Sequence, residues 1–92
     1  MLFEKSHFGK PISDKLSNYL RKHTDKFDRA NVSTKTNIGT STIRDVVLRT
    51  NSLTESNSKA VLELMKIAVK NCTFIIKDTT IAKEELETML KG

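Results

Sequence analysis

Apolar residues recur three and four positions apart along most of this 92-residue chain, and this spacing constrains its fold more than any other feature. One such run begins at Ile12, and others fall within residues 43–47, 61–68 and 81–90. The spacing is that of one face of an α-helix. We therefore predict an all-α fold.

The expected bounds of the N-terminal helices follow from the residues that flank these runs. Residues 1–10 have no sustained period and are expected to form an N-terminal arm. Pro11 suits a first helical turn because its missing N–H is not needed there, so the first helix is predicted over about residues 11–25. Asp28 is predicted to cap a short, weak helix that ends near residue 36.

The C-terminal half predicts a core helix followed by an extension. A wide apolar stripe favours a central helix over about residues 58–71, after a polar connection from which Leu53 points inward. Residues 72–76 are β-branched and apolar, and they indicate either a short strand or an extended cover over the core. Asp78 and the threonines after it favour the start of a final helix. Residues 72–92 are thus expected to form a C-terminal extension to a domain over residues 11–71.

The excess of positive over negative charge is confined to the N-terminal half of the chain. The 16 Lys and Arg residues exceed the 11 Asp and Glu residues, giving a net charge of +5. Residues 1–50 carry 10 basic and 5 acidic residues, whereas residues 51–92 carry 6 of each. All four arginines lie in the first half, and arginine's planar fork suits phosphates and guanine edges. Such an excess is typical of nucleic-acid binding, although a basic surface kept for solubility would give it too.

Several functional classes receive no support from the residue types present. A single cysteine, Cys72, excludes an internal disulfide and a Cys-rich zinc site, and we expect it to be a small buried hydrophobe near a helix end. His23 has only His7 to accompany it, which favours a packed core-edge histidine over a metal ligand. No phosphate loop or nucleophile motif is present, so we predict neither an enzyme nor a cofactor nor a small-molecule ligand. The chain has no apolar run of membrane-spanning length and no signal core, so we expect a cytoplasmic protein without a membrane partner.

The segment around Asn37 carries the functional prediction. Asn37 stands where a tight turn between two helices needs a positive φ, which Asn tolerates well. Four residues earlier, Ser33 is small enough for the two helices to approach closely, and Ile38, Ile43 and Val47 can fix the second helix onto the first. The second helix then stands out from the body, where its first turn can enter a DNA major groove about 12 Å wide.

These residues resemble the helix-turn-helix of the phage Cro and repressor family, also called the Xre-like family. The matching stretch is RANVSTKTNIGTSTIRDVV, residues 29–47, and the resemblance extends over about residues 11–71. It implies a lambda-repressor-like bundle of about five helices. The core of the motif would consist of Val32, Ser33, Asn37, Ile38, Ile43 and Val47.

The resemblance also implies roles for individual side chains. The family's base-reading positions fall on Thr40, Ser41, Arg44 and Asp45. Arg44 suits a bidentate contact to guanine, while Asp45 would accept a hydrogen bond from cytosine or orient Arg44 or Arg49. Contacts to DNA phosphates are expected from Arg29, Lys35 and Arg49.

The sequence therefore predicts a regulator of transcription, of phage or mobile-element type, that binds double-stranded DNA as a repressor. The alternative is a small helical protein-interaction module, such as an antirepressor or assembly factor, that does not bind DNA. Family members commonly pair on two half-sites, so a homodimer is expected. Its contact would be made by Phe74, Ile75, Ile76, Leu86, Met89 and Leu90, unless these residues pack on the chain's own core.

Overall fold

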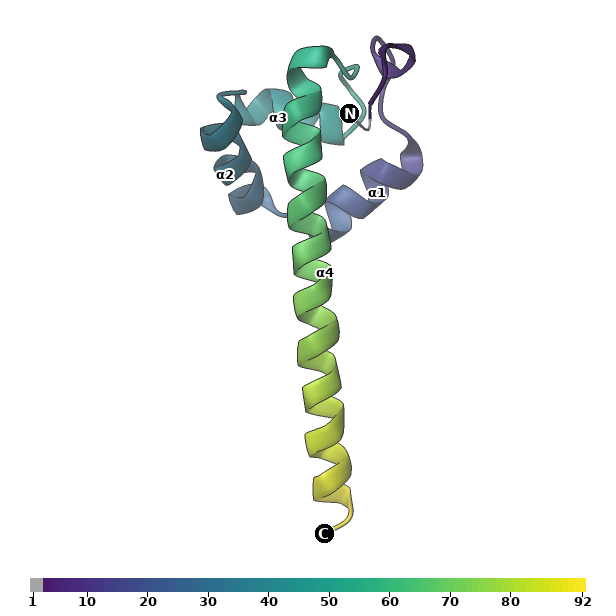
Figure 1. Cartoon of the computed structure of the whole chain (residues 1–92), viewed down its shortest axis with the longest axis vertical. Coiled ribbons are helices and arrows are strands. Elements are labelled where there is room, and N and C mark those ends of the chain that lie inside the picture. Colours follow the sequence, from purple (N-terminus) through teal and green to yellow (C-terminus); the bar gives the residue numbers. More distant parts are fainter. Residues whose placement is uncertain (1–2) are drawn as a thin grey trace.

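The computed structural model describes residues 3–92, which form four α-helices and one turn of 3-10 helix over Lys5–His7. The α-helices are α1 (Asp14–His23), α2 (Lys26–Thr36), α3 (Thr40–Val47) and α4 (Glu55–Leu90). The fold is all-α, as the apolar spacing predicts. Figure 1 shows α1, α2 and α3 gathered around the first half of α4, whose second half projects away alone. The molecule measures 59 × 25 × 23 Å because of this projection.

Hydrogen-bonding side chains fix where α1 and α2 begin, and both differ from the predicted starts. The Ser13 hydroxyl accepts a hydrogen bond from the N–H of Leu16 at 3.1 Å, so α1 begins after Ser13 and not at Pro11. At α2, the Asp25 carboxylate accepts from the N–H of Asp28 at 2.9 Å, and the Asp28 carboxylate accepts from the N–H of Asp25 at 3.1 Å. Asp28 is therefore the third residue of a reciprocal cap and not the N-cap itself.

One hydrophobic core joins the four helices where α1, α2 and α3 meet α4. Leu20, Val32, Ile43 and Leu64 are each buried to 1% exposure or less. Leu53, from the connection before α4, is buried among them, as predicted. Ala68 is the last residue of α4 that is buried, so the core ends about two-fifths of the way along this helix.

The prediction of a strand and a separate final helix at the C-terminus is wrong. Residues 72–76, and the segment around Asp78 and Thr80, lie inside α4, which is continuous from Glu55 to Leu90. A strand needs a neighbouring strand for its backbone groups, and residues 3–92 contain none, whereas a helix satisfies those groups internally. Thr73 and Thr80 also donate hydroxyl hydrogen bonds to the carbonyls four residues earlier. Cys72 is consequently half-buried within the helix and is not near a helix end.

The N-terminal segment is held against the body. The N–H of Gly9 donates to the carbonyl of Leu53, and the N–H of Leu53 donates to the carbonyl of Lys10, each at 2.8 Å. Phe3 and Phe8 pack on the edge of the core. Among residues 3–92, no helix has an apolar stretch long enough to cross a membrane.

Candidate nucleic-acid interface

The turn between α2 and α3 has the geometry that the sequence predicts for it. Asn37 has φ 59° and ψ 31°, in the left-handed region. Its N–H donates to the carbonyl of Ser33 at 2.8 Å, and the Thr36 hydroxyl donates to the carbonyl of Val32 at 2.7 Å. These bonds close the last turn of α2 and let α3 begin at Thr40, three residues after Asn37.

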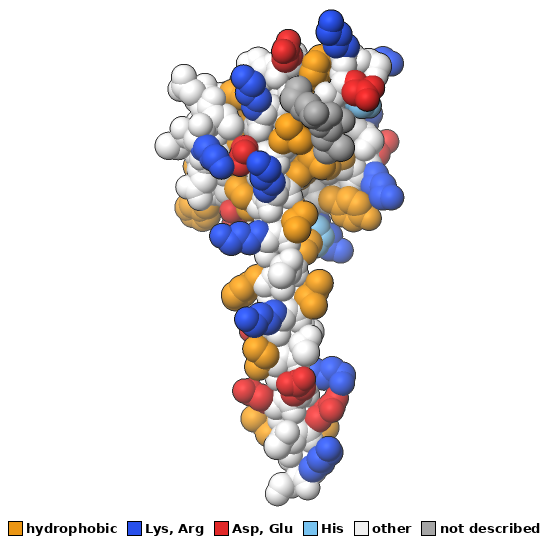
Figure 2. All heavy atoms as spheres, in the orientation of Figure 1, with side chains coloured by type: hydrophobic (Ala, Val, Ile, Leu, Met, Phe, Trp, Pro, Cys, Tyr) orange, Lys and Arg blue, Asp and Glu red, His pale blue; other side chains and the backbone are white. Residues whose placement is uncertain are grey.

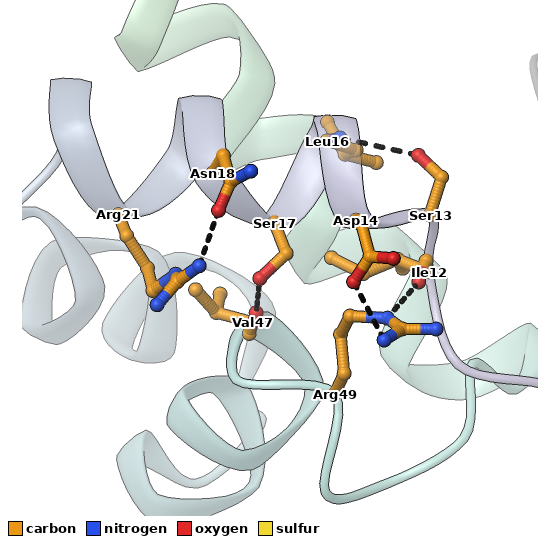
Figure 3. Close-up of polar contacts among 9 residues, drawn as sticks. All are labelled: Ile12, Ser13, Asp14, Leu16, Ser17, Asn18, Arg21, Val47 and Arg49. Atoms are coloured by element: carbon orange, nitrogen blue, oxygen red, sulfur yellow. Dashed lines mark hydrogen bonds and ion pairs between the residues drawn. The ribbon is translucent and has the colours of Figure 1, made fainter.

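The inner side of α3 is fixed to the body by apolar packing and by one buried hydrogen bond. Ile43, Val46 and Val47 are buried, and Ile38 packs against the same core while remaining partly exposed. The buried Ser17 hydroxyl of α1 donates to the carbonyl of Val47 at 2.6 Å, as Figure 3 shows. Because a carbonyl at a helix C-terminus has no partner within its own helix, this bond also satisfies the end of α3.

The outer side of α3 faces solvent. Thr40, Ser41 and Arg44 are exposed, and Asp45 is half-exposed. The Nε atom of Arg44 lies 3.3 Å from a carboxylate oxygen of Asp45. This contact is the one that Asp45 needs in order to orient Arg44, which is one of the two roles expected for it. The projecting half of α4 extends away from this face. The four residues predicted to read bases therefore remain accessible on one short helix.

A shallow groove with a basic lining runs between the start of α2 and the start of α3. Thr40, Ser41 and Arg44 form one wall. The other wall comes from α2 and is formed by Lys26, Phe27, Arg29 and Ala30. The lining thus holds three cationic side chains and no carboxylate. Of the three residues predicted to contact phosphate, the structure brings Arg29 together with the base-reading set.

Lys35 and Arg49, also predicted to contact phosphate, both have acidic partners. The ammonium group of Lys35 lies 2.9 Å from the carboxylate of Glu63, which also contacts Lys66 at 3.3 Å. Hydrogen bonds from these two lysines hold the pKa of the Glu63 carboxyl below its usual value.

Arg49 is held more firmly than Lys35. Its guanidinium donates to the carbonyl of Ile12 and to the carboxylate of Asp14, each at 2.7 Å (Figure 3). Its φ of 67° is also positive, so this residue turns the chain after α3. Arg49 therefore ties the end of α3 to the start of α1, and a phosphate would have to compete with Asp14 for it.

Two residues of the groove, Lys26 and Phe27, are not among those predicted from the sequence. Phe27 lies four residues after His23, a spacing that is typical of one face of a continuous helix. The chain instead breaks at Thr24 and Asp25, and α2 starts in a new direction, which leaves Phe27 69% exposed. The signal for this break was the pair of aspartates three residues apart, Asp25 and Asp28, that form the reciprocal cap.

Comparison with known proteins identifies no relative of this chain. No family model, curated protein or solved structure matches the chain. We therefore infer a function from the geometry of the site and from its charge.

Proposed function

We propose that this protein binds double-stranded DNA and regulates transcription, with α2 and α3 acting as a helix-turn-helix. In this proposal α3 enters the major groove, and Thr40, Ser41, Arg44 and Asp45 face the base edges. A regulator of this kind acts by occupying an operator and blocking polymerase, which is the mode of a phage or mobile-element repressor.

The observation that carries the proposal is the exposed, carboxylate-free groove between α2 and α3. Its three cations, Lys26, Arg29 and Arg44, lie beside two hydroxyl-bearing residues on a helix whose other side is fixed in the core. Hydroxyl and guanidinium groups on an exposed first helical turn are the donors that DNA phosphates and base edges accept. The groove lies on the body, whereas Glu84, Glu85 and Glu87 lie on the projecting part of α4.

The charge of the whole molecule supports the same proposal. Residues 3–71 contain 13 basic and 7 acidic residues, a surplus of +6, whereas residues 72–92 contain 3 basic and 4 acidic residues. A polyanion is therefore attracted to the body and not to the projection. Figure 2 shows basic side chains spread over the body among acidic ones, and a group of acidic side chains beside basic ones on the projection.

The alternative of a protein-interaction module is favoured by one observation, the exposed apolar surface. Phe27 lies in the basic groove, and large apolar side chains cover the projecting half of α4. In that case the helices would bind a protein partner, and the chain would not bind duplex DNA even at low salt.

Titration of a labelled duplex with the full chain at two salt concentrations tests the proposal. With about four phosphate contacts, the affinity is expected to fall about 10²-fold between about 50 and 200 mM salt, because each contact releases counterions. Arg29→Ala or Lys35→Ala should weaken binding to all sequences alike and reduce the salt slope by about one. Absence of binding at the lower salt concentration would overturn the proposal and favour the alternative.

A matched pair of variants then tests the role of α3. Arg44→Ala is expected to cost about 1–3 kcal/mol on a cognate site, because it removes a bidentate base contact. Lys77→Ala removes the same unit of charge from the projecting part of α4 and is expected to leave the affinity nearly unchanged. Equal losses for the two variants would show that only net charge matters and would contradict the assignment of Arg44.

A further inference from the structure

The second half of α4 is a long helix with no neighbour in its own chain. The body reaches along α4 as far as Asn71, whose side-chain amide donates to the carbonyl of His23 at 2.8 Å and contacts Asp28 at 3.3 Å. Every residue from Thr73 to the end of the chain is exposed. The free segment of 18 residues is about 27 Å long, and most helical stability in proteins comes from the packing of an amphipathic face. Its stability therefore calls for a partner.

Apolar residues form a stripe along one side of this free segment. Positions 72, 76, 79, 83, 86 and 90 follow one another at alternating spacings of four and three, the pattern of a coiled-coil seam. Thr79 and Lys83 are polar and lie at the middle of the seam. The other seam residues are apolar: Cys72, Ile76, Leu86 and Leu90. Ile75, Ala82 and Met89 widen the stripe along one edge. By the same helical geometry Phe74 lies outside the stripe, although it is one of the residues predicted from the sequence to make the dimer contact.

We propose that this stripe binds the same stripe of a second copy in an antiparallel, two-stranded coiled coil. In this pairing Ile76 packs on Leu86 of the second copy, Thr79 on its Lys83, and Cys72 on its Leu90. The two-fold axis passes beside residue 81, so each of these contacts occurs twice. The proposal defines the dimer expected for the DNA-binding protein, but it does not depend on DNA binding.

Charge decides the direction of the two helices. A parallel pair in register would place Lys83 directly opposite Lys83 of the second copy in the seam. Like charges at this distance repel, so the parallel arrangement is unfavourable. The antiparallel pair instead places Lys83 opposite an uncharged Thr79. Lys83 already makes an ion pair with Glu87 of its own chain, which holds its ammonium group at the edge of the seam.

The length of the free segment fixes the register. Pairing Cys72 with Leu90 uses the whole of α4 beyond the body, and a longer overlap would require the second copy to displace α1. The apolar stripe also continues onto the body as a groove between α1 and α4, lined among others by Tyr19, His23, Val69 and Cys72. The end of the second copy, at Met89 and Leu90, reaches the mouth of this groove in the proposed register.

A matched pair of substitutions tests whether the stripe makes the dimer. Sedimentation of the full chain without DNA is expected to show a dimer. Ile76→Asp should raise its dissociation constant at least about tenfold, because it places a charge in the seam. Ile81→Asp makes the same change five residues away, on the other side of the helix, and should leave the dissociation constant unchanged. Both sites are exposed in the single chain, so neither change is expected to unfold it. A monomeric wild-type chain, or equal effects of the two substitutions, would overturn the proposal.

A distance measurement tests the direction of the helices. A spin label on Lys91→Cys, in a chain that also carries Cys72→Ser, lies ten residues from the proposed two-fold axis. The two labels of an antiparallel dimer should therefore be about 30 Å apart. A parallel dimer would bring them within about 15 Å, close to the spacing of two packed helices. The shorter distance would overturn the antiparallel arrangement. The distance between the labels does not depend on whether the chain binds DNA, so this test is separate from the test of DNA binding.

Discussion

The backbone of Asn37 decides whether α2 and α3 can meet over so short a turn. Its φ of 59° is costly for most side chains, and Asn tolerates it better than they do. Asn37→Ala is therefore expected to lower the free energy of unfolding by about 1 kcal/mol, whereas Asn37→Gly should leave it unchanged or slightly higher. Urea denaturation of the three proteins measures this difference. Equal destabilisation by Ala and Gly would instead show that the Asn37 side chain, and not its backbone conformation, accounts for the loss of stability.

Single residues also show how far the candidate site could be predicted from the sequence. Thr40, Ser41 and Arg44 were predicted on the outer face of α3, and they are exposed there because the helical period of α3 is unambiguous. The partners of Lys35 and Arg49 could not be predicted, because Glu63 and Asp14 lie 28 and 35 residues away in the chain. Ion pairs between distant segments depend on the packing of the helices, which the local pattern does not contain.

The helix α3 has one face that packs in the core and one face that is open to a ligand. Two adjacent residues, Ile43 and Arg44, lie on these two faces. Ile43→Ala is expected to cost about 2–5 kcal/mol of stability, because Ile43 is 1% exposed and its loss leaves a cavity in the core. Arg44→Ala should change stability by less than about 0.5 kcal/mol, since Arg44 is exposed. Thermal unfolding of the two variants tests this contrast. A large loss for Arg44→Ala would mean that its pairing with Asp45 is structural.

The four helices differ in how well the sequence predicts them. For α3 the apolar period gives the right inner face, because Ile43 and Val47 are buried as predicted. For α1 the period is only a partial guide, because Leu20 is buried but Tyr19 is 52% exposed and the polar Ser17 is buried. The prediction fails for α4, where local β-propensity at residues 72–76 suggests a break. Propensity is a weak guide there, because Thr54 and Asn57 cap the helix and no Gly or Pro interrupts it before its end.

The whole molecule combines a basic body with an unpartnered, apolar and acidic projection. In the proposed antiparallel dimer, the midpoints of the body segments of the two α4 helices, residues 55–71, lie about 54 Å apart along the helix axis. This separation exceeds the 34–36 Å that separates successive turns of one face of a duplex. If both bodies bind one duplex, the half-sites should therefore be more than one turn apart.

Selection of bound sequences from a pool of random duplexes tests the central claim that the outer face of α3 reads DNA. The wild-type chain is expected to enrich a defined site, with half-sites more than one helical turn apart. Arg44→Ala should lose the preference for guanine at one position of each half-site while it still binds duplex DNA. No enrichment by the wild-type chain at low salt, or an identical site enriched by Arg44→Ala, would contradict the claim.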